Sequence, residues 1–207
     1  KEMLDTKNDT FEGKTISLSG FGNVTWGSAL KLTELGGKVV TISGPDGYIY
    51  DEKGLDAEKI DYLLALRASN NDIVSPYVQE FPEAKFYPGE KPWGVKCDIA
   101  MPCATQNELN GDEAKILVDN GCICVAEGAN MPSTIEAVHT FQKARILYAP
   151  GKASNAGGVA TSGLEMSQNS LRLSWTSEEV DEKLHGIMKS IHEACVQFGT
   201  GADGYVD

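Results

Sequence analysis

The chain has 207 residues, 41% of them hydrophobic and 23% charged, which is ordinary for a globular protein of one large domain or two small ones. Its 18 Lys and Arg residues stand against 30 Asp and Glu residues, giving a formal net charge of −12. This acidic balance argues against a nucleic-acid partner and against docking on an anionic membrane surface. No stretch is apolar enough over a sufficient length to span a bilayer.

The N-terminus and the cysteines bear on where the protein is located in the cell. The N-terminus lacks the layout of a signal peptide and begins with Lys1 rather than Met, so we expect a piece of a longer protein. The five cysteines form no C-x-x-C pair. Four of them lie in or beside apolar runs, where a reduced thiol behaves as a small hydrophobe: Cys97, Cys103, Cys122 and Cys124. These features predict a cytoplasmic protein without a disulfide framework.

The first periodic segments form a β-turn-α-β unit. A polar lead-in over 1–14 precedes a predicted strand at 15–19. A predicted helix over 23–35 then ends at two glycines, and a second predicted strand at 38–43 runs into a turn at 44–47. Strand, tight turn, helix and strand in this order are typical of a nucleotide-binding unit.

The alternation of strands and helices continues to the end of the chain. Further strands are predicted at 97–101, 122–126 and 145–149. Further helices are predicted at 56–66, 73–81, 110–118, 133–141, 159–169 and 176–199. Capping boxes mark three helix starts: Asn110 with Glu113, Ser133 with Glu136, and Thr176 with Glu179. Since no hairpin signal is present, we predict one α/β domain over 15–207, a doubly wound, mostly parallel, Rossmann-like sheet with helices on both faces.

The sharpest local motif is Gly20-x-Gly22-x-x-Thr25, placed between the first strand and the first helix. Two glycines let the backbone turn tightly and approach a pyrophosphate that faces the helix N-terminus. An ordinary tight turn is the alternative, but the position within the βαβ unit favours a dinucleotide site. Thr25 departs from the usual Gly or Ala at the third position.

Asp46 follows the second strand, where an acidic residue typically binds the hydroxyls of the adenosine ribose. No Lys or Arg lies between Lys38 and Lys53 to hold a 2′-phosphate, which favours NAD over NADP without excluding NADP. The alternative is that Asp46 serves only the turn at 45–47.

Three later loops, 102–107, 127–130 and 155–158, each supply small residues and an amide side chain just past a predicted strand. In open α/β sheets this is the edge at which ligands bind. The histidines at 185 and 192 are more typical of a packed or solvated helix face than of a metal site, and no metal is predicted. No G-x-S-x-G motif supports a serine hydrolase.

Six segments resemble the hexameric bacterial glutamate dehydrogenases, which belong to the Glu/Leu/Phe/Val dehydrogenases. They are GFGNV at 20–24, SGPDG at 43–47, MPCATQN at 101–107, AEGANMP at 126–132, APGKASNAGGV at 149–159 and SGLEMSQN at 162–169. The resemblance covers essentially the whole chain and implies the NAD(P)-binding domain of an enzyme that reversibly converts L-glutamate to 2-oxoglutarate and ammonia. It further implies a homo-hexamer with no nucleic-acid or membrane partner.

The resemblance also implies that the catalytic lysine and aspartate lie in an upstream domain outside this chain. It implies further that the family continues past Asp207 into a final helix that packs back on that domain. On this basis the chain alone is expected to bind the cofactor but to lack activity. Two alternatives stay open: another amino-acid dehydrogenase acting on Leu, Phe or Val, and a non-catalytic dinucleotide-binding or sensor module.

Residue roles follow from the same resemblance. The implied cofactor-binding residues are Gly20, Phe21, Gly22, Asn23, Val24, Ser43, Asp46, Ala104, Thr105, Asn130 and Asn155. Among them, 20–24 would hold the pyrophosphate, while Asn130 and Asn155 would orient the nicotinamide amide. Val159 and Ser162 would bind substrate. The segment 44–47 resembles NAD-type enzymes and 127–132 resembles NADP-type enzymes, so the cofactor is NAD or NADP, with NAD slightly favoured.

Overall fold

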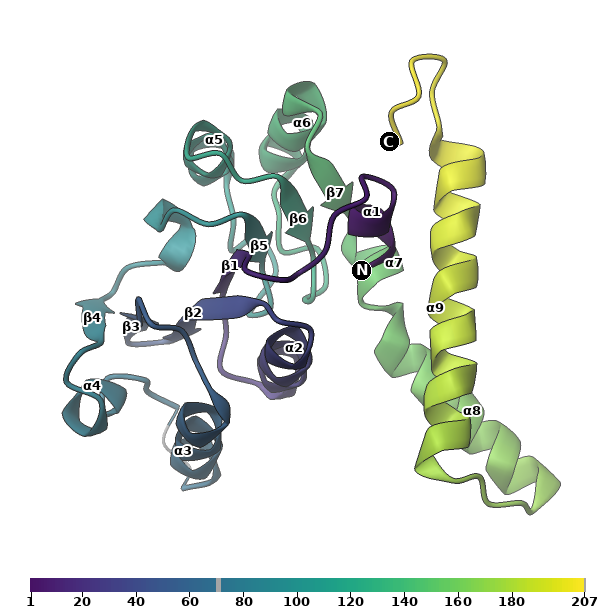
Figure 1. Ribbon diagram of the computed structural model, residues 1–207, viewed down its shortest axis with the longest axis horizontal. Coiled ribbons are helices and arrows are strands. Elements are labelled where there is room, and N and C mark those ends of the chain that lie inside the picture. Colours follow the sequence, from purple (N-terminus) through teal and green to yellow (C-terminus); the bar gives the residue numbers. More distant parts are fainter. Residues whose placement is uncertain (70–71, 207) are drawn as a thin grey trace.

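A computed structural model describes residues 1–69 and 72–206 and shows a seven-stranded sheet in the order β4-β3-β2-β1-β5-β6-β7 (Figure 1). The strands are β1 Thr15–Leu18, β2 Lys38–Gly44, β3 Gly47–Tyr50, β4 Lys85–Pro88, β5 Ile99–Met101, β6 Cys124–Ala126 and β7 Leu147–Ala149. Strands β2, β1, β5, β6 and β7 pair in parallel. The predicted α/β class with a mostly parallel sheet is therefore confirmed.

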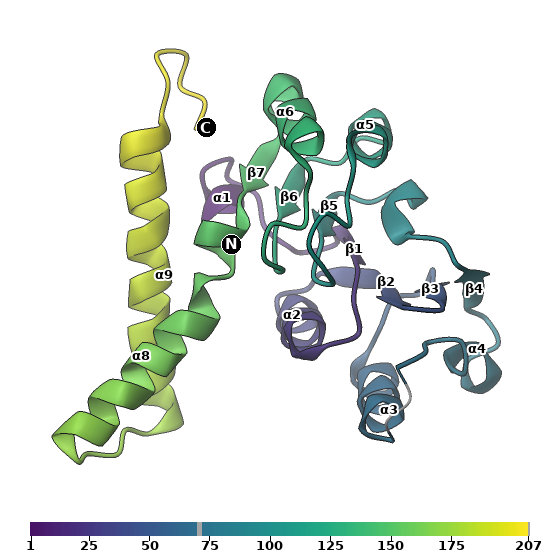
Figure 2. The ribbon, with the colours of Figure 1, turned by 180° about the vertical axis from the view of Figure 1, so that it is seen from behind.

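Helices cover both faces of this sheet. They are α1 Glu2–Asp5, α2 Asn23–Glu34, α3 Ala57–Ala68, α4 Tyr77–Glu80, α5 Gly111–Asp119, α6 Ile135–Ala144, α7 Gly151–Ser154, α8 Ala156–Leu171 and α9 Ser177–Gly199, with a 3-10 turn at Pro92–Gly94. Helices α2, α3 and α4 lie on one face, and α5 and α6 lie on the other (Figures 1 and 2). Within the described residues, no helix is long and apolar enough to cross a membrane.

Each face of the sheet has its own hydrophobic core. On the α2–α3 side, inward-facing strand residues such as Ile16 and Ile42 pack with Trp26 and Leu63. On the α5–α6 side, the core contains Trp93, Leu117, Val125 and Phe141. The short lead-in joins the first core through Leu4 of α1, which is 2% exposed. The four cysteines predicted to behave as small hydrophobes are all buried.

The prediction that the chain has no hairpins is wrong. Strands β2 and β3 are antiparallel, Gly44 pairs with Gly47, and β4 continues the antiparallel edge. The segment 44–47 is a turn, as predicted, and its two central residues connect β2 and β3 as a hairpin. Gly47, the first residue of β3, has φ +140°. A Cβ at Gly47 would lie 2.2 Å from the Tyr87 carbonyl oxygen, so only glycine allows β4 to approach this closely.

Two predicted helix starts also differ from the structure. In place of a helix over 73–81, only the single turn α4 forms, because Ser75 precedes Pro76 and is biased away from helical geometry. At α6 the capping residue is Thr134 and not Ser133. The Thr134 hydroxyl accepts a hydrogen bond from the Ala137 amide. The predicted capping boxes that start α5 and α9 are both confirmed.

The C-terminal part of the chain leaves the sheet after β7. The predicted helix at 159–169 lies within α8, which begins earlier than expected, at Ala156, directly after the short α7. Helix α8 leads away from the sheet, and α9 packs against α8 and returns past α7 and α1 (Figures 1 and 2). A groove of about 760 Å³ between α8 and α9 is lined by residues that include Leu164, Trp175 and Ile187.

Candidate functional site

The glycine turn after β1 has the geometry that a close backbone approach requires. Gly20 has φ +90°, and a Cβ there would lie 2.6 Å from Thr25 Oγ1 and 2.9 Å from the Cys103 carbonyl oxygen. Thr25, which departs from the usual small residue, is buried and donates a hydrogen bond of 3.0 Å to the Ser19 carbonyl. The hydroxyl therefore ties the start of α2 to the end of β1, so the threonine fits this position.

Helix α2 begins immediately after the turn, so its N-terminus lies at the carboxyl end of β1. Its N-cap, Gly22, has an extended backbone and no side chain to cap the first-turn amides, and a Cβ at Gly22 would meet no atom within 4 Å. The Val24 side chain is 48% exposed beside it. The amides that follow are thus open to an anion.

Phe21 differs from its neighbours because its ring points into the protein. The side chain is 6% exposed and packs edge-on against Trp26, with ring centroids 5.2 Å apart. Only the backbone of Phe21 is therefore placed to contact a ligand at the glycine turn.

Ser43 joins the second strand to the glycine turn, since its hydroxyl oxygen accepts a hydrogen bond of 2.8 Å from the Gly20 amide. Asp46 lies farther along, in the β2–β3 connection. Its carboxylate accepts hydrogen bonds from the Val74 amide, at 3.0 and 3.2 Å, and from the Ser75 amide at 3.0 Å. Asp46 therefore holds the loop before α4, beyond its own turn, and a bond to a ribose stays a prediction.

The loop after β5 is organised by a carboxylate that the sequence motifs did not identify. Glu108 accepts hydrogen bonds from the amides of Ala104, at 2.8 Å, and Thr105, at 3.3 Å. Its side chain is buried, and this burial raises the pKa of the carboxyl above its usual range. The Ser19 hydroxyl accepts a hydrogen bond of 2.9 Å from the Cys103 amide, which joins this loop to the glycine turn.

A second unidentified carboxylate, Glu127, organises the loop after β6. It is 3% exposed and accepts hydrogen bonds from the Tyr148 hydroxyl at 2.9 Å and the Gly151 amide at 2.7 Å. Burial and the neighbouring carboxylate raise the pKa of Tyr148 far above its usual value, so the phenol stays protonated and donates. The sequence signal that could have identified Glu127 is its place among small residues directly after a strand, whereas Glu108 lies well past the end of β5 and has no such signal.

The two predicted amide side chains lie together. Asn155 donates from Nδ2 to the Asn130 Oδ1 atom, at 2.6 Å, and to the Ala129 carbonyl, at 3.2 Å. The loop carrying Asn130 is fixed in turn, because the Gly128 and Ala129 amides both donate to the Pro102 carbonyl. The loops after β5, β6 and β7 therefore form one connected edge.

The predicted substrate residues lie apart from these loop contacts. Val159 and Ser162 are on α8, three residues apart and therefore on one face of the helix. Both side chains are exposed, Val159 to 73%. Among the described residues there is also no group of three or more His, Cys, Asp or Glu side chains able to hold a metal ion.

Comparisons with known proteins agree with this architecture. The family described as Glutamate/Leucine/Phenylalanine/Valine dehydrogenase matches residues 1–205. An NAD-specific glutamate dehydrogenase from Bacteroides fragilis is 63% identical over 206 residues, covering 100% of this chain and 46% of the relative. An NADP-specific glutamate dehydrogenase from Haemophilus influenzae is 50% identical, covering 96% of this chain and 44% of the relative.

Solved structures show the same fold. Glutamate dehydrogenase from Plasmodium falciparum superimposes with a TM-score of 0.91 at 47% identity, covering 95% of this chain and 42% of that one. The chain thus spans slightly less than half the length of the relatives it matches. With a family match over nearly all of its residues, the chain belongs to the Glutamate/Leucine/Phenylalanine/Valine dehydrogenase family.

Proposed function

We propose that this chain is the dinucleotide-binding part of a glutamate dehydrogenase and that it binds NAD in preference to NADP. The intact enzyme would convert L-glutamate, NAD(P)⁺ and water reversibly to 2-oxoglutarate, NAD(P)H and ammonia. The observation that carries the proposal is the edge of hydrogen-bonded loops around Gly20, at the carboxyl ends of the parallel strands. The names of the relatives, both NAD- and NADP-specific glutamate dehydrogenases, support the reaction class.

The residues of this edge fit a dinucleotide along its length. The open space at Gly22 and the uncapped amides of α2 suit the pyrophosphate. At the adenosine end, Asp46 offers a carboxylate to ribose hydroxyls and would repel a 2′-phosphate. At the other end, Asn130 and Asn155 offer amide groups that match a carboxamide. The nicotinamide ring, when bound, supplies or accepts the hydride.

We further propose that the 207 residues alone bind the cofactor without turning over glutamate. The intact protein would then supply the catalytic lysine and aspartate. In it, Val159 and Ser162 would contact the substrate, and the subunits would assemble into a cytoplasmic homo-hexamer. In support, α8 and the segment after it expose several large apolar side chains. They are Val159, Met166, Leu171 and Leu173.

The test is a parallel fluorescence titration of the chain with NADH and NADPH. Trp26 is buried next to the glycine turn and is the natural reporter, which Trp26→Phe would verify. Tighter binding of NADH than of NADPH supports the whole proposal. Equal binding keeps the cofactor site but rejects the role of Asp46 in discrimination, and binding of neither rejects the site.

Two alanine substitutions locate the binding. In Gly22→Ala the new methyl group meets no protein atom within 4 Å but fills the space proposed for the pyrophosphate. We expect NADH affinity to fall about tenfold or more, since one poorly accommodated contact of about 1.4 kcal/mol has this effect. Gly27→Ala, one turn along α2 and equally free of contacts, is the matched control and should leave affinity unchanged.

A further inference from the structure

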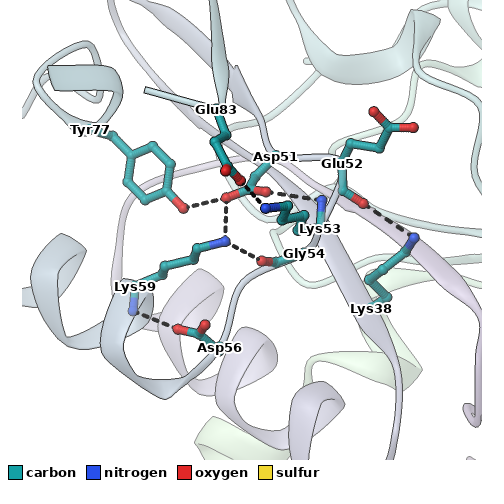
Figure 3. A network of polar contacts seen from close by, with 9 residues as sticks. All are labelled: Lys38, Asp51, Glu52, Lys53, Gly54, Asp56, Lys59, Tyr77 and Glu83. Atoms are coloured by element: carbon teal, nitrogen blue, oxygen red, sulfur yellow. Dashed lines mark hydrogen bonds and ion pairs between the residues drawn. The ribbon is translucent and has the colours of Figure 1, made fainter. Parts of the chain in front are cut away.

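A buried polar cluster lies outside the loops described above, between β3, α3 and α4 (Figure 3). Asp51 is at its centre and is 2% exposed. Its Oδ2 atom accepts hydrogen bonds from Lys59 Nζ at 2.7 Å and from the Tyr77 hydroxyl at 2.8 Å. Its Oδ1 atom accepts from the Lys53 amide at 3.0 Å, and Lys59 also donates to the Gly54 carbonyl. We call Asp51, Lys59 and Tyr77 the Asp51 cluster.

Asp51 and Lys59 form a buried ion pair. A buried carboxylate is strongly destabilising without a counter-charge and hydrogen bonds, and here it has both. Burial and the hydrogen bond to Asp51 raise the pKa of Tyr77 far above its usual value, so the phenol remains a donor. Tyr77 itself is fully buried and packs against Phe81, with ring centroids 4.7 Å apart. Its hydroxyl is therefore held in one position.

Tyr77 connects this cluster to Asp46. Its backbone amide donates to the Val74 carbonyl at 3.0 Å, and the Val74 and Ser75 amides donate to the Asp46 carboxylate. The same loop lies so close to β2 that a Cβ at Gly44 would be 3.2 Å from Val74 Cγ1. The position of the Asp46 carboxylate thus depends on a loop whose far end is anchored at Asp51.

We infer that Tyr77 and Asp51 are positioning residues that fix the Asp46 carboxylate and thereby set discrimination between dinucleotides with a free 2′-hydroxyl and those with a 2′-phosphate. This inference rests on the proposed function. A carboxylate attracts a hydroxyl donor and repels a phosphate to an extent that depends on distance. When the loop loses its anchor, the carboxylate can turn away, which weakens both effects.

The test is Tyr77→Phe, which removes the hydroxyl and keeps the ring in the core. Dissociation constants for NADH and NADPH are measured in the parent and the variant. We expect the preference for NADH over NADPH to fall by about three- to tenfold, the size associated with one hydrogen bond. Tyr87→Phe is the matched control, because Tyr87 of β4 stacks on Tyr48 of β3 and its ring lies outside the Asp51 cluster. It should leave the preference unchanged.

A double substitution separates positioning from a general loss of structure. In an Asp46→Asn background, Tyr77→Phe should produce no further change in the preference. An equal change in both backgrounds, or an unchanged preference in the single variant, would overturn the inference while leaving the proposed function intact. If the parent binds neither dinucleotide, the proposed function fails and the inference fails with it.

A second variant tests the inference if Tyr77→Phe does not fold. Should circular dichroism show that Tyr77→Phe is unfolded, Asp51→Asn replaces it, since the neutral amide keeps an oxygen acceptor but weakens its bonds to Lys59 and Tyr77. A fall in preference with retained secondary structure supports the inference, and a folded variant with unchanged preference contradicts it.

Discussion

The side-chain amide of Asn155 donates a hydrogen bond of 2.6 Å to the side-chain oxygen of Asn130 and thereby joins the loops that follow two neighbouring strands. A second bond from the same nitrogen, to the Ala129 carbonyl, uses its remaining hydrogen. The Asn155 side-chain oxygen and the Asn130 side-chain nitrogen are then the acceptor and donor that can face a ligand. A nicotinamide carboxamide presents the complementary donor and acceptor.

The first prediction tests this pair in the full-length enzyme. Asn155→Ala should lower kcat by about tenfold to a hundredfold, because a ring displaced by about 1 Å loses alignment for hydride transfer. Steady-state kinetics of glutamate oxidation measure the effect. Asn169→Ala, at an exposed position of α8, is the control. A turnover number that does not change in Asn155→Ala would reject this role.

The second prediction concerns Glu127, whose two carboxylate oxygens accept from the Tyr148 hydroxyl and the Gly151 amide. In Glu127→Gln one oxygen becomes an amide nitrogen, which can donate to the Tyr148 oxygen but leaves the hydroxyl hydrogen of Tyr148 without its acceptor. We expect the free energy of unfolding to fall by about 1–3 kcal/mol, the cost of a buried group left without a partner. Urea denaturation measures it. Glu165→Gln, exposed on α8, should change stability by less than about 0.5 kcal/mol.

Much of the fold could be predicted because its signals are local. The starts of α5 and α9 follow from capping boxes, Asn110 with Glu113 and Thr176 with Glu179, in which both partners lie within one helical turn. The glycine turn is equally local, and Gly20 has the positive φ that its place after a strand requires.

The features that the sequence did not predict depend on contacts between distant segments. The strand β3 is only four residues long and is defined by pairing with β2 and β4. Glu108 and Glu127 are acidic residues that tertiary packing buries, and composition alone assigns such residues to the surface. The Asp46 carboxylate binds the amides of Val74 and Ser75, which lie 28 and 29 residues away, and no local pattern indicates these partners.

The third prediction concerns Gly20, whose positive φ is readily adopted only by glycine. In Gly20→Ala the methyl group would lie within 3 Å of both Thr25 Oγ1 and the Cys103 carbonyl, at a positive φ. We expect the free energy of unfolding to fall by about 2 kcal/mol or more, from backbone strain and overpacking together. Gly163→Ala, within α8 and free of neighbours, should instead raise it by about 0.5–1 kcal/mol. Denaturant midpoints for the two variants should therefore move in opposite directions.

The last prediction follows from the raised pKa of the buried Glu108 carboxyl. In the unfolded chain this group titrates near its ordinary value of about 4.3, so between that value and its raised folded value the native state binds more protons. Stability contributed by this group is therefore lost as the pH rises through the folded pKa. Glu108→Gln removes the titration but keeps an oxygen acceptor for the Ala104 and Thr105 amides. The stability of the parent relative to the variant, measured by urea denaturation at a series of pH values, should decrease as the pH rises from the unfolded pKa through the raised folded pKa. A difference that instead increases with pH would show that the hydrogen bonds to the carboxylate outweigh its burial.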